Sequence, residues 1–354
     1  MMERRMNIRN QIIDKDELIL MTGASGFIGS RVLNALMECG FTNIRCMVQR
    51  ETDAEVLSEI TSRYENASVE IFQGDLLRKS DSQKAVQGVS VIFHLAAGFG
   101  KSFRHIYKNT VLATRNLLDA ATGEQTIKRL LCVSSFTVYS TGGLKKGGIL
   151  DETCEVYTNP GLKGEAYCCG KVRQEEMVFD YNKRNGLPFV IVRPGYVYGP
   201  GNPEISGRIG VSKLNTFFHM GGSNSIPVSF VENCADAIVL AGLTGGVEGQ
   251  VFNIVDDDQP RSSEFLAAYK KHVRPSRTVS MPKVVSYLLC AFWGSSAKMS
   301  GGRLPLTYNL YRWSDDWKGN IYPNRKIKEQ LGWEQRVSLE EGMMRYFEYC
   351  RKAV

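Results

Sequence analysis

A glycine-rich turn between an apolar strand and an amphipathic helix constrains the fold of this chain more than any other feature. Residues 17–21 read ELILM and continue directly into TGASGFIG at Thr22–Gly29. The helix predicted after this turn, Phe27–Cys39, has one apolar face, formed by Ile28, Val32, Leu33 and Leu36. A strand, a glycine turn and a helix in this order form the first half of a βαβ unit, which requires a parallel sheet.

Short apolar runs alternate with longer amphipathic segments between about Glu17 and Val192. This alternation is typical of a parallel sheet that is covered by helices on both faces. Two segments, Ser102–Ala121 and Glu165–Asn185, are long enough to form full helices. The predicted strands are Leu18–Thr22, Ile44–Val48, Val69–Phe72, Val91–Leu95, Arg129–Ser134 and Phe189–Val192. The sequence therefore predicts an α/β fold with a Rossmann-type, doubly wound parallel sheet.

The composition of the sequence changes beyond the last of these strands: glycine and proline become frequent, and the apolar and amphipathic segments become shorter. Such regions usually supply substrate-binding loops over the rim of a sheet. We therefore expect an N-terminal extension at 1–16, a Rossmann domain at 17–193 and a mainly substrate-binding region at 194–354. Segments at about 230–256 are expected to return to the main domain, with Gln250–Val255 as a strand of the main sheet.

The composition argues against several other classes of protein. The chain of 354 residues carries a net charge of +7, but its basic runs, such as Met1–Arg9 and Arg325–Lys328, are short and lack the interleaved aromatic residues of a nucleic-acid surface. We interpret the charge as dispersed and mildly attractive to anionic ligands. The nine cysteines form no C-x-x-C pair and no metal-binding spacing, so we expect reduced thiols, no metal site and a cytoplasmic setting.

No segment is apolar over the roughly 18 residues needed to span a bilayer, and the N-terminus has no signal-peptide pattern. The nearest candidate for a membrane element is VVSYLLCAFW at Val284–Trp293. We expect this segment to be a buried helix. An apolar lid and a helix that lies on a membrane surface are the alternatives.

The glycine turn has the spacing of a dinucleotide-binding loop. Gly23 allows a tight turn, Gly26 lets the backbone approach a pyrophosphate, and Gly29 lets the helix and the strand pack closely. The free N–H groups at the start of the helix would meet the phosphates. We therefore expect a bound NAD(P), with contacts from Thr22, Gly23, Ser25, Gly26, Phe27, Ile28 and Gly29.

The end of the second strand distinguishes NADP from NAD. An acidic residue there binds the ribose 2′-hydroxyl, whereas an arginine can bind a 2′-phosphate. The sequence reads Gln49-Arg50-Glu51, so Arg50 favours NADP, and Glu51 on the ribose of NAD is the alternative. After the third strand, Asp75 is placed to accept a hydrogen bond from the adenine amino group, or it serves only as a helix cap.

Tyr167 and Lys171 lie one helical turn apart on the same face of a predicted helix. A nearby ammonium group favours the phenolate and would lower the pKa of Tyr167 toward the working pH, as acid–base catalysis on an alcohol requires. Ser135 lies just past the fifth strand, at the sheet edge where such folds bind ligands, and its hydroxyl can bind the reacting oxygen. These three side chains are the candidate catalytic residues.

Further motifs accompany the Tyr167/Lys171 pair along nearly the whole chain. They are TGASGFIG at Thr22–Gly29, GDL at Gly74–Leu76, HLAA at His94–Ala97, NTVLATRNLLDAA at Asn109–Ala121, SSFTVY at Ser134–Tyr139, RPGYVYGPG at Arg193–Gly201 and LGWEQRVSLEEG at Leu331–Gly342. Together they resemble the extended short-chain dehydrogenase/reductase family, also called the NAD-dependent epimerase/dehydratase family. The resemblance implies Ser135 as the catalytic serine, Tyr167 as the acid or base, and Lys171 as the group that tunes Tyr167 and binds the nicotinamide ribose.

The resemblance implies other contacts as well. His94 is expected to be structural, and a homodimer is expected to form through the helices at Ser102–Ala121 and Glu165–Asn185. Substrate contacts are expected from Ser135, Phe136, Thr137 and Tyr196. Further cofactor contacts are expected from Arg50, Asp75, Leu76, Leu95, Ala96, Ala97, Asn109, Ser134, Tyr167, Lys171, Arg193 and Pro194.

The serine motif narrows the reaction. Family dehydratases resemble T-D-E-V-Y there, and nucleotide-sugar decarboxylases carry a glutamate beside the serine or threonine, whereas this chain reads SFTVY at Ser135–Tyr139. We therefore expect an oxidoreductase that transfers a hydride at a secondary alcohol or ketone, with a substrate like that of 3β-hydroxysteroid dehydrogenases or a sugar-like one. A nucleotide-sugar 4-epimerase that acts through a keto intermediate is the alternative, and a non-catalytic NAD(P)-sensing regulator is an alternative of another class.

Three departures from the nucleotide-sugar pattern favour the oxidoreductase. Tyr196 stands where sugar-nucleotide enzymes commonly have an asparagine, and Ser225-Ile226-Pro227 stands in place of an Arg-Asp pair. The region of Val284–Trp293 and Leu304–Tyr308 is similar to the apolar C-terminal part of 3β-hydroxysteroid-dehydrogenase-like members.

Overall fold

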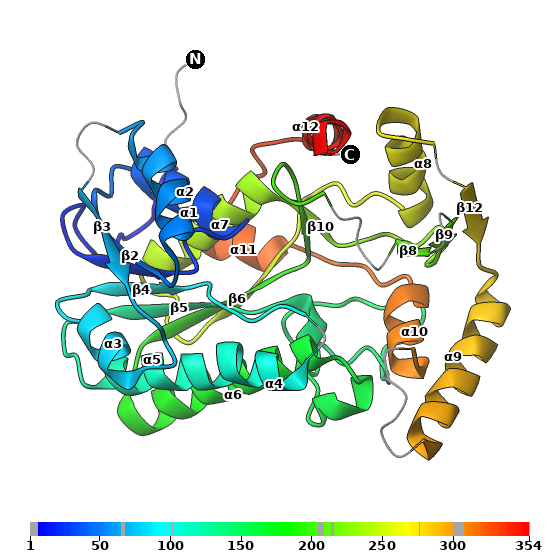
Figure 1. Ribbon diagram of the computed structural model, residues 1–354, viewed down its shortest axis with the longest axis horizontal. Coiled ribbons are helices and arrows are strands. Elements are labelled where there is room, and N and C mark those ends of the chain that lie inside the picture. Colours follow the sequence, from blue (N-terminus) through cyan, green and yellow to red (C-terminus); the bar gives the residue numbers. More distant parts are fainter. Residues whose placement is uncertain are drawn as a thin grey trace.

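The structure is a computed structural model that describes residues 6–64, 68–100, 102–203, 209–213, 216–275, 277–300 and 308–353. Its central sheet consists of β1 (Ile19–Thr22), β2 (Asn43–Val48), β3 (Ser68–Gln73), β4 (Val91–His94), β5 (Arg129–Val133), β6 (Phe189–Pro194) and β11 (Val251–Ile254). All seven strands are parallel, in the order β11-β6-β5-β4-β1-β2-β3 (Figure 1). The strand order reverses direction between β1 and β4, which is where open sheets of this type bind ligands.

Helices cover both faces of this sheet (Figure 1). One face carries α1 (Gly29–Glu38), α2 (Glu51–Thr61), α7 (Val231–Leu243) and α11 (Arg325–Leu331), whose apolar residues share one core cluster. The other face carries α3 (Lys79–Ala85), α5 (Ala113–Thr122) and α6 (Ala166–Asn185), which share a second cluster. The predicted α/β fold is confirmed, and the predicted return strand at Gln250–Val255 corresponds to β11, which pairs with β6.

Two predicted helices differ in detail from the observed ones. The first begins at Gly29 rather than at Phe27, because the residues before Gly29 complete the glycine turn. The segment expected to be one helix at Ser102–Ala121 is divided into α4 (Phe103–Ile106), a π-helical turn η1 (Tyr107–Leu112) and α5. Single π-helical turns inside helices are frequent at functional sites, and this turn carries Asn109.

The C-terminal part adds small sheets and helices beside the main sheet. Strand β7 (Tyr196–Tyr198) pairs with β10 (Val228–Phe230), and β9 (Thr216–His219) pairs with β8 (Gly210–Lys213) and β12 (Arg277–Ser280). The helices of this part are α8 (Ser262–His272), α9 (Lys283–Met299), α10 (Leu310–Trp317) and α12 (Leu339–Ala353). A third apolar cluster joins β10, α8 and α12.

The prediction of a buried helix at Val284–Trp293 is wrong. The segment does form a helix, α9, but its large apolar side chains Val284, Leu288, Leu289 and Phe292 are exposed. The helix packs mainly on α10, which buries one narrow face only. The similar segment at Leu304–Tyr308 lies outside the described residues except for Tyr308.

None of the helices in the described ranges combines the length and the apolar character needed to cross a bilayer. All nine cysteines are free thiols. Among the described residues, no group of histidine, cysteine and acidic side chains has the arrangement of a metal site.

Candidate active site

The glycine turn at the end of β1 is built as a close-approach site. Gly23 has φ +75°, a left-handed conformation that favours glycine. A Cβ atom at Gly29 would overlap the Gly23 carbonyl, so glycine is also required where α1 crosses the turn. Helix α1 begins without a side-chain cap and without an acidic residue in its first turn. The N–H groups of Ser30 and Val32 donate to the carbonyls of Gly26 and Ile28, so an anionic group such as a pyrophosphate would meet the positive end of the helix dipole and the turn before it.

A cleft of about 430 Å³ lies over the carboxyl ends of β1 to β4. Of the predicted cofactor contacts, the cleft is lined by Thr22, Gly23, Ser25, Gly26, Arg50, Asp75, Leu76, Leu95, Ala96, Ala97 and Asn109. The remaining lining residues are Met47, Val48, Gln49, Asp53, Gly74, Leu77, Gly98, Phe99, His105 and Ala113. The shape, the glycine turn and the uncapped helix together fit a dinucleotide.

The end of the cleft beside β2 contains a pair of opposite charges. Arg50 Nη2 lies 3.1 Å from Asp53 Oδ1, and the Arg50 side chain is 75% exposed. Hydrogen bonds from Arg50, and also from Ser25, hold the pKa of Asp53 below its usual value. Asp53 lines the cleft, whereas Glu51 is exposed in the first turn of α2. Of these two carboxylates, the one that lines the cleft is therefore Asp53, not Glu51.

Asp75 faces the cleft but is partly engaged in its own turn. Its Oδ1 accepts hydrogen bonds from the Leu77 N–H at 2.9 Å and from Gln49 Nε2 at 3.1 Å. Asp75 thus stabilises the turn before α3 and fixes the Gln49 amide at the cleft wall. Asp75 is not the cap of α3, whose N-cap residue is Arg78, so the helix-cap alternative is wrong. The hydrogen bond from the adenine amino group stays a prediction, and the position of Asp75 on the cleft wall is compatible with it.

The tyrosine and the serine that the sequence singles out meet at the carboxyl end of β5. Ser135 begins a short 3₁₀ helix, η2 (Phe136–Val138), and its Oγ accepts a hydrogen bond from the Thr137 N–H at 3.2 Å. Tyr167 is the second residue of α6 and stacks on Phe99 with ring centroids 5.5 Å apart. Because Phe99 lines the cleft, Tyr167 lies next to the cleft wall, although it does not line the cleft itself.

The prediction that Lys171 lowers the pKa of Tyr167 is wrong, because the pKa of Tyr167 is raised. Burial raises the pKa of Tyr167 to about 12, and a hydrogen bond with Ser135 opposes this shift. The Lys171 ammonium lies 5.8 Å from the Tyr167 ring centroid, and its protons are donated elsewhere. Burial lowers the pKa of Lys171 to about 8, which makes its charge sensitive to pH in the physiological range.

A buried chain of hydrogen bonds begins at Lys171. Its Nζ donates to the Val133 carbonyl at 2.6 Å and to Gln174 Oε1 at 2.9 Å. Gln174 Nε2 donates to Thr114 Oγ1 at 2.9 Å. Thr114 belongs to α5 and Gln174 to α6, so the chain joins two helices beneath the sheet edge.

The same chain of hydrogen bonds continues to the glycine turn. Nε2 of His94 lies 2.9 Å from Thr114 Oγ1, and Nδ1 of His94 lies 2.7 Å from Thr22 Oγ1. Thr22 Oγ1 also accepts a hydrogen bond from the Ala96 N–H at 3.3 Å. Burial, followed by the nearby Lys171 charge, lowers the pKa of His94 to about 3, so the imidazole is neutral. His94 is a buried structural link, in agreement with the expectation for it.

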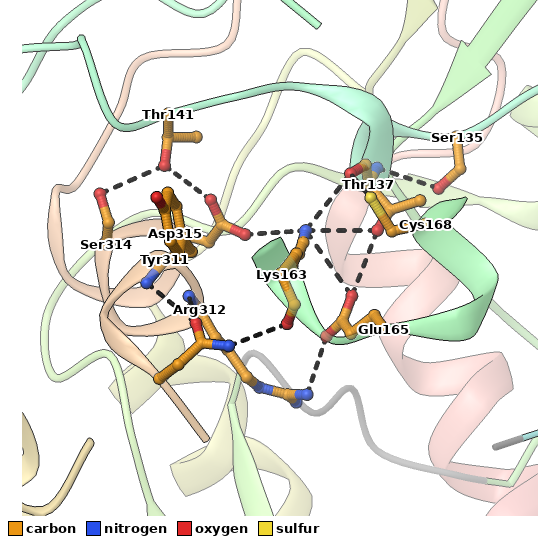
Figure 2. Close-up of polar contacts among 11 residues, drawn as sticks. Ser135, Thr137, Thr141, Lys163, Glu165, Cys168, Tyr311, Arg312, Ser314 and Asp315 are labelled. Atoms are coloured by element: carbon orange, nitrogen blue, oxygen red, sulfur yellow. Dashed lines mark hydrogen bonds and ion pairs between the residues drawn. The ribbon is translucent and has the colours of Figure 1, made fainter. Parts of the chain in front are cut away.

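A second polar cluster lies on the other side of Ser135, where η2, the 3₁₀ helix η3 (Pro160–Lys163) and α10 meet (Figure 2). Lys163 is buried at its centre, with Nζ 2.9 Å from Asp315 Oδ2 and 3.6 Å from Glu165 Oε2. Lys163 Nζ also donates to the carbonyl and the hydroxyl of Thr137, both at 3.3 Å. Burial alone would lower the pKa of Lys163, but the two carboxylates outweigh it and raise that pKa.

Glu165 in this cluster is a carboxylate close to the candidate catalytic residues. It precedes Tyr167 by two residues, and its Oε2 accepts a hydrogen bond from Thr137 Oγ1 at 3.4 Å. Its Oε1 accepts a hydrogen bond from Arg312 Nη1 at 2.9 Å (Figure 2). Because Lys163 and Arg312 compensate its charge, Glu165 positions the start of α6 rather than serving as a free base.

Several predicted site residues have structural surroundings instead. Arg193 is buried and donates two hydrogen bonds to Glu175, at 2.9 and 2.6 Å, which leaves its guanidinium committed to that carboxylate. Phe136 is buried in an apolar cluster with Tyr139 and Tyr322, and is therefore a packing residue. The other predicted cofactor contacts that do not line the cleft are Phe27, Ile28, Gly29, Ser134, Tyr167, Lys171 and Pro194, and the predicted substrate contacts Ser135, Thr137 and Tyr196 do not line it either.

Ser134 and Tyr196 have different environments. The Ser134 hydroxyl is buried without a hydrogen-bond partner, beside the Ser135 turn, and is the kind of polar atom that a ligand can satisfy. Tyr196 lies in β7 and packs against the third apolar cluster, formed with β10, α8 and α12.

Sequence reasoning missed the residues whose roles depend on contacts between distant elements. The sequence did contain a local signal for Asp53. A carboxylate at the third position of a helix commonly accepts a hydrogen bond from the N–H of the residue before the helix, as Asp53 does from the Arg50 N–H. Gln174 and Thr114 had no signal beyond their helices. Lys163 and Asp315 are separated by most of the C-terminal half of the chain, and no local pattern predicts their pairing.

Comparisons with known proteins agree with this geometry. The model of the NAD dependent epimerase/dehydratase family matches residues 19–254. The 3beta-hydroxysteroid-dehydrogenase/decarboxylase isoform 2 of Arabidopsis thaliana is 27% identical over 359 aligned residues, which cover 92% of this chain and 60% of that protein. The decarboxylating sterol-4-alpha-carboxylate 3-dehydrogenase of Mus musculus is 27% identical in an alignment that covers 72% of this chain and 68% of the mouse protein.

Solved structures show the same fold. The UDP-glucuronic acid 4-epimerase of Bacillus cereus, solved with UDP-glucuronic acid and NAD, superposes with a TM-score of 0.71 over 95% of this chain and 100% of its own, at 22% identity. The family match covers both the glycine turn and the Ser135, Tyr167 and Lys171 positions. This chain is an enzyme of the NAD-dependent epimerase/dehydratase family.

Proposed function

We propose that this enzyme transfers a hydride between NAD(P) and a secondary alcohol or ketone, with Ser135, Tyr167 and Lys171 as its catalytic residues. The observation that carries the proposal is the placement of Ser135, at the end of β5, beside Tyr167 at the start of α6, where the Ser135 hydroxyl opposes the rise in the Tyr167 pKa that burial causes. Phe99 connects this pair to the cleft, because it both stacks on Tyr167 and lines the cleft wall. A phenol and an alcohol side by side can bind one substrate oxygen together.

Each of the three residues has a distinct part in the proposed reaction. Tyr167 donates its proton to the carbonyl oxygen of a ketone, or accepts the proton of an alcohol in the reverse direction. Ser135 donates a hydrogen bond to the same oxygen and fixes its position. Lys171, protonated below its pKa of about 8, stabilises the phenolate that forms. The nicotinamide, when bound, supplies or accepts the hydride.

The charges around the site support simple hydride transfer over dehydration. The carboxylate nearest to the Tyr167 helix turn, Glu165, is paired with Arg312 and Lys163. The side chain beside Ser135 is Phe136, which is buried in a core cluster. Neither position offers the extra free acid or base that elimination of water requires.

For the substrate we propose an apolar ring alcohol or ketone. Two relatives with a similar sequence are named as 3β-hydroxysteroid and sterol dehydrogenases, which supports this class. The Ser225-Ile226-Pro227 segment, with Ile226 buried, offers no charged group for a nucleotide diphosphate. A nucleotide-sugar 4-epimerase is the second candidate, supported by the likeness in fold alone.

The decisive experiment combines one variant with a substrate panel. Tyr167→Phe is expected to lower kcat about 10²- to 10⁴-fold while the dissociation constant of the cofactor stays unchanged. Turnover of the variant at the wild-type rate would show that Tyr167 is not the acid. Oxidation of 3-hydroxysteroids, with no conversion of UDP-, GDP- or dTDP-sugars, is expected; turnover of a UDP-sugar without net change of NAD(P) would instead establish the epimerase.

We propose NADP(H) as the preferred cofactor, because Arg50 lines the cleft beside the carboxyl end of β2. Asp53 opposes this preference, since its carboxylate is ion-paired with Arg50 and would repel a 2′-phosphate. Direct titration with NADPH and NADH tests the proposal. A lower dissociation constant for NADH would overturn it.

We propose that the enzyme is a homodimer, formed through α4, η1 and α6, and that it works in the cytoplasm. A groove of about 530 Å³ between these helices has an apolar part, with Phe103, Tyr107, Val111 and Met177, and Phe103 and Tyr107 are about half exposed. The charged residues on its wall are Arg115, Arg173, Glu176 and Asp180. Apolar surface of this kind typically marks an interface. The free thiols support a reducing compartment. Light scattering is expected to give twice the chain mass, and Tyr107→Glu is expected to give a monomer.

A further inference from the structure

Helix α9 is amphipathic with its large apolar side chains on the outside. Its buried residues are small: Ser286, Cys290 and Ala297 are at most 5% exposed, and Ser286 Oγ accepts a hydrogen bond from Trp313 of α10. A helix on the surface of a water-soluble domain normally shows the reverse arrangement, with large apolar residues inside and polar residues outside.

The most exposed apolar residues of α9 form one continuous stripe. Val284, Leu288, Phe292 and Met299 are 69, 60, 73 and 88% exposed. At about 100° per residue their side chains fall within roughly 80° of the helix circumference. Leu289, 54% exposed, flanks this stripe and lines an apolar groove of about 400 Å³ with Phe218, Met220, Met281 and Trp293. Apolar surface that is concentrated in this way marks a contact site.

The positive charge of the chain is concentrated in the same segment. Residues 265–314 contain eight lysine and arginine residues and no aspartate or glutamate, whereas the rest of the chain carries one net negative charge. This concentration corrects the earlier interpretation that the charge is dispersed. Lys271, Arg274, Arg277 and Lys283 are exposed, on the end of α8, on β12 and at the start of α9.

The cationic residues and the apolar stripe lie on one margin of the molecule. Figure 1 shows α8, β12 and α9 following each other along that margin, with α10 between α9 and the sheet. A surface that presents an apolar helix next to unneutralised cations is complementary to a layer with an apolar interior and anionic head groups. We propose that α9, with the basic segment before it, binds to the surface of an anionic lipid bilayer.

The helix would lie in the plane of the interface rather than cross it. Its 17 residues correspond to about 25 Å along the axis, and the face with Ser286, Cys290 and Ala297 stays buried against the protein. Val284, Leu288 and Phe292 would enter the boundary between head groups and acyl chains, while Arg274, Arg277 and Lys283 would bind the lipid phosphates. This proposal does not depend on the one for the reaction, because no residue of the cleft takes part.

Vesicle co-sedimentation of the full chain tests the proposal. Binding to vesicles of phosphatidylcholine with phosphatidylglycerol is expected, with weaker binding to phosphatidylcholine alone and a decrease as salt is added. Leu288→Ser/Phe292→Ser is expected to weaken binding about 100-fold. Arg274→Gln/Arg277→Gln is expected to weaken it roughly 30-fold on anionic vesicles only.

Matched controls remove the same kind of side chain elsewhere. Val56→Ser/Met344→Ser deletes two exposed apolar residues from α2 and α12, and Arg184→Gln/Lys352→Gln deletes two exposed cations. Both controls are expected to bind like the wild type. Absence of wild-type binding, or an equal loss in the controls, would overturn the proposal. A lower mass in light scattering for Leu288→Ser/Phe292→Ser, without vesicle binding by the wild type, would identify a second copy of the chain as the occupant.

Discussion

Gln174 accepts a hydrogen bond from Lys171 at 2.9 Å and donates one to Thr114, so the ammonium beside the candidate catalytic tyrosine is held by an amide on its own helix. Gln174 is fully buried and does not line the cleft. Its hydrogen bonds reach the cleft indirectly, through Thr114 and His94 to Thr22. It is a positioning residue. The glycine turn and the Lys171 ammonium are therefore mechanically linked.

Gln174→Glu should shift the pH dependence of catalysis. Burial lowers the pKa of Lys171 to about 8, so the wild type should lose kcat/KM as pH rises through that value and the ammonium loses its proton. A carboxylate at position 174 would stabilise the ammonium and raise the pKa of Lys171. The alkaline limb of the pH profile, where kcat/KM falls, should therefore move to a pH about one unit higher. Gln87→Glu, which adds the same charge at an exposed site, should leave the limb in place. An unchanged limb in Gln174→Glu would show that the limb belongs to another group.

Asp53→Asn should change cofactor preference. Removal of this carboxylate releases Arg50 from its ion pair and removes the repulsion of a 2′-phosphate. The ratio of the dissociation constants for NADH and NADPH should rise about tenfold in favour of NADPH. Fluorescence titration with both cofactors measures it, and Arg50→Ala should move the ratio in the opposite direction. A ratio equal to the wild-type value in both variants would remove this pair from the ribose site.

Lys163→Met should be among the more destabilising changes in the chain. Lys163 and Asp315 are 4% and 7% exposed, so the variant leaves a buried carboxylate without its cation and should lower the free energy of unfolding by about 3–5 kcal/mol. The double variant Lys163→Met/Asp315→Leu should lose less of the free energy of unfolding than Lys163→Met alone. Arg184→Met breaks the exposed pair with Asp180 and should cost about 0–1 kcal/mol. Chemical denaturation gives the three values, and equal losses for the single and double variants would contradict the coupling.

His94 should make the fold sensitive to mild acid. Its pKa is about 3 in the folded chain against 6.5 for the free group, so the unfolded state binds more protons below pH 6.5 and the free energy of unfolding falls as pH falls through that range. Between pH 7.5 and pH 5 this contribution amounts to about 2 kcal/mol. His94→Gln, which keeps the links to Thr22 and Thr114, should show a smaller loss over the same interval. Parallel pH profiles of the two proteins would refute the assignment.

Two parts of the site could be predicted because their signals are local. The glycine turn follows β1 and precedes α1 without interruption, and only glycine tolerates the backbone conformation at Gly23 and the crossing at Gly29. Tyr167 and Lys171 are neighbours on one helix at any position in a fold. The carboxyl ends of parallel strands meet at one edge, so the order of strands also predicted that Ser135 and the glycine turn share that edge.

The burial of α9, in contrast, could not be predicted from its sequence. The sequence shows an apolar helix at Val284–Trp293, but periodicity reports only that side chains share a face, and not what that face contacts. Burial and exposure depend on which element packs against the helix. Here α10 covers the narrow face with Ser286 and Cys290, and the large residues stay outside.

The sequence by itself therefore determined the parallel sheet, the dinucleotide turn and the positions of Ser135, Tyr167 and Lys171, because each follows from short-range spacing and strand order. Only the tertiary structure decided that Asp53 rather than Glu51 lines the cleft, and that Lys163 pairs with Asp315. It also decided that burial, not the Lys171 charge, dominates the pKa of Tyr167. Ion pairing and desolvation depend on distances between elements that are remote in the chain, and spacing along the sequence does not contain those distances.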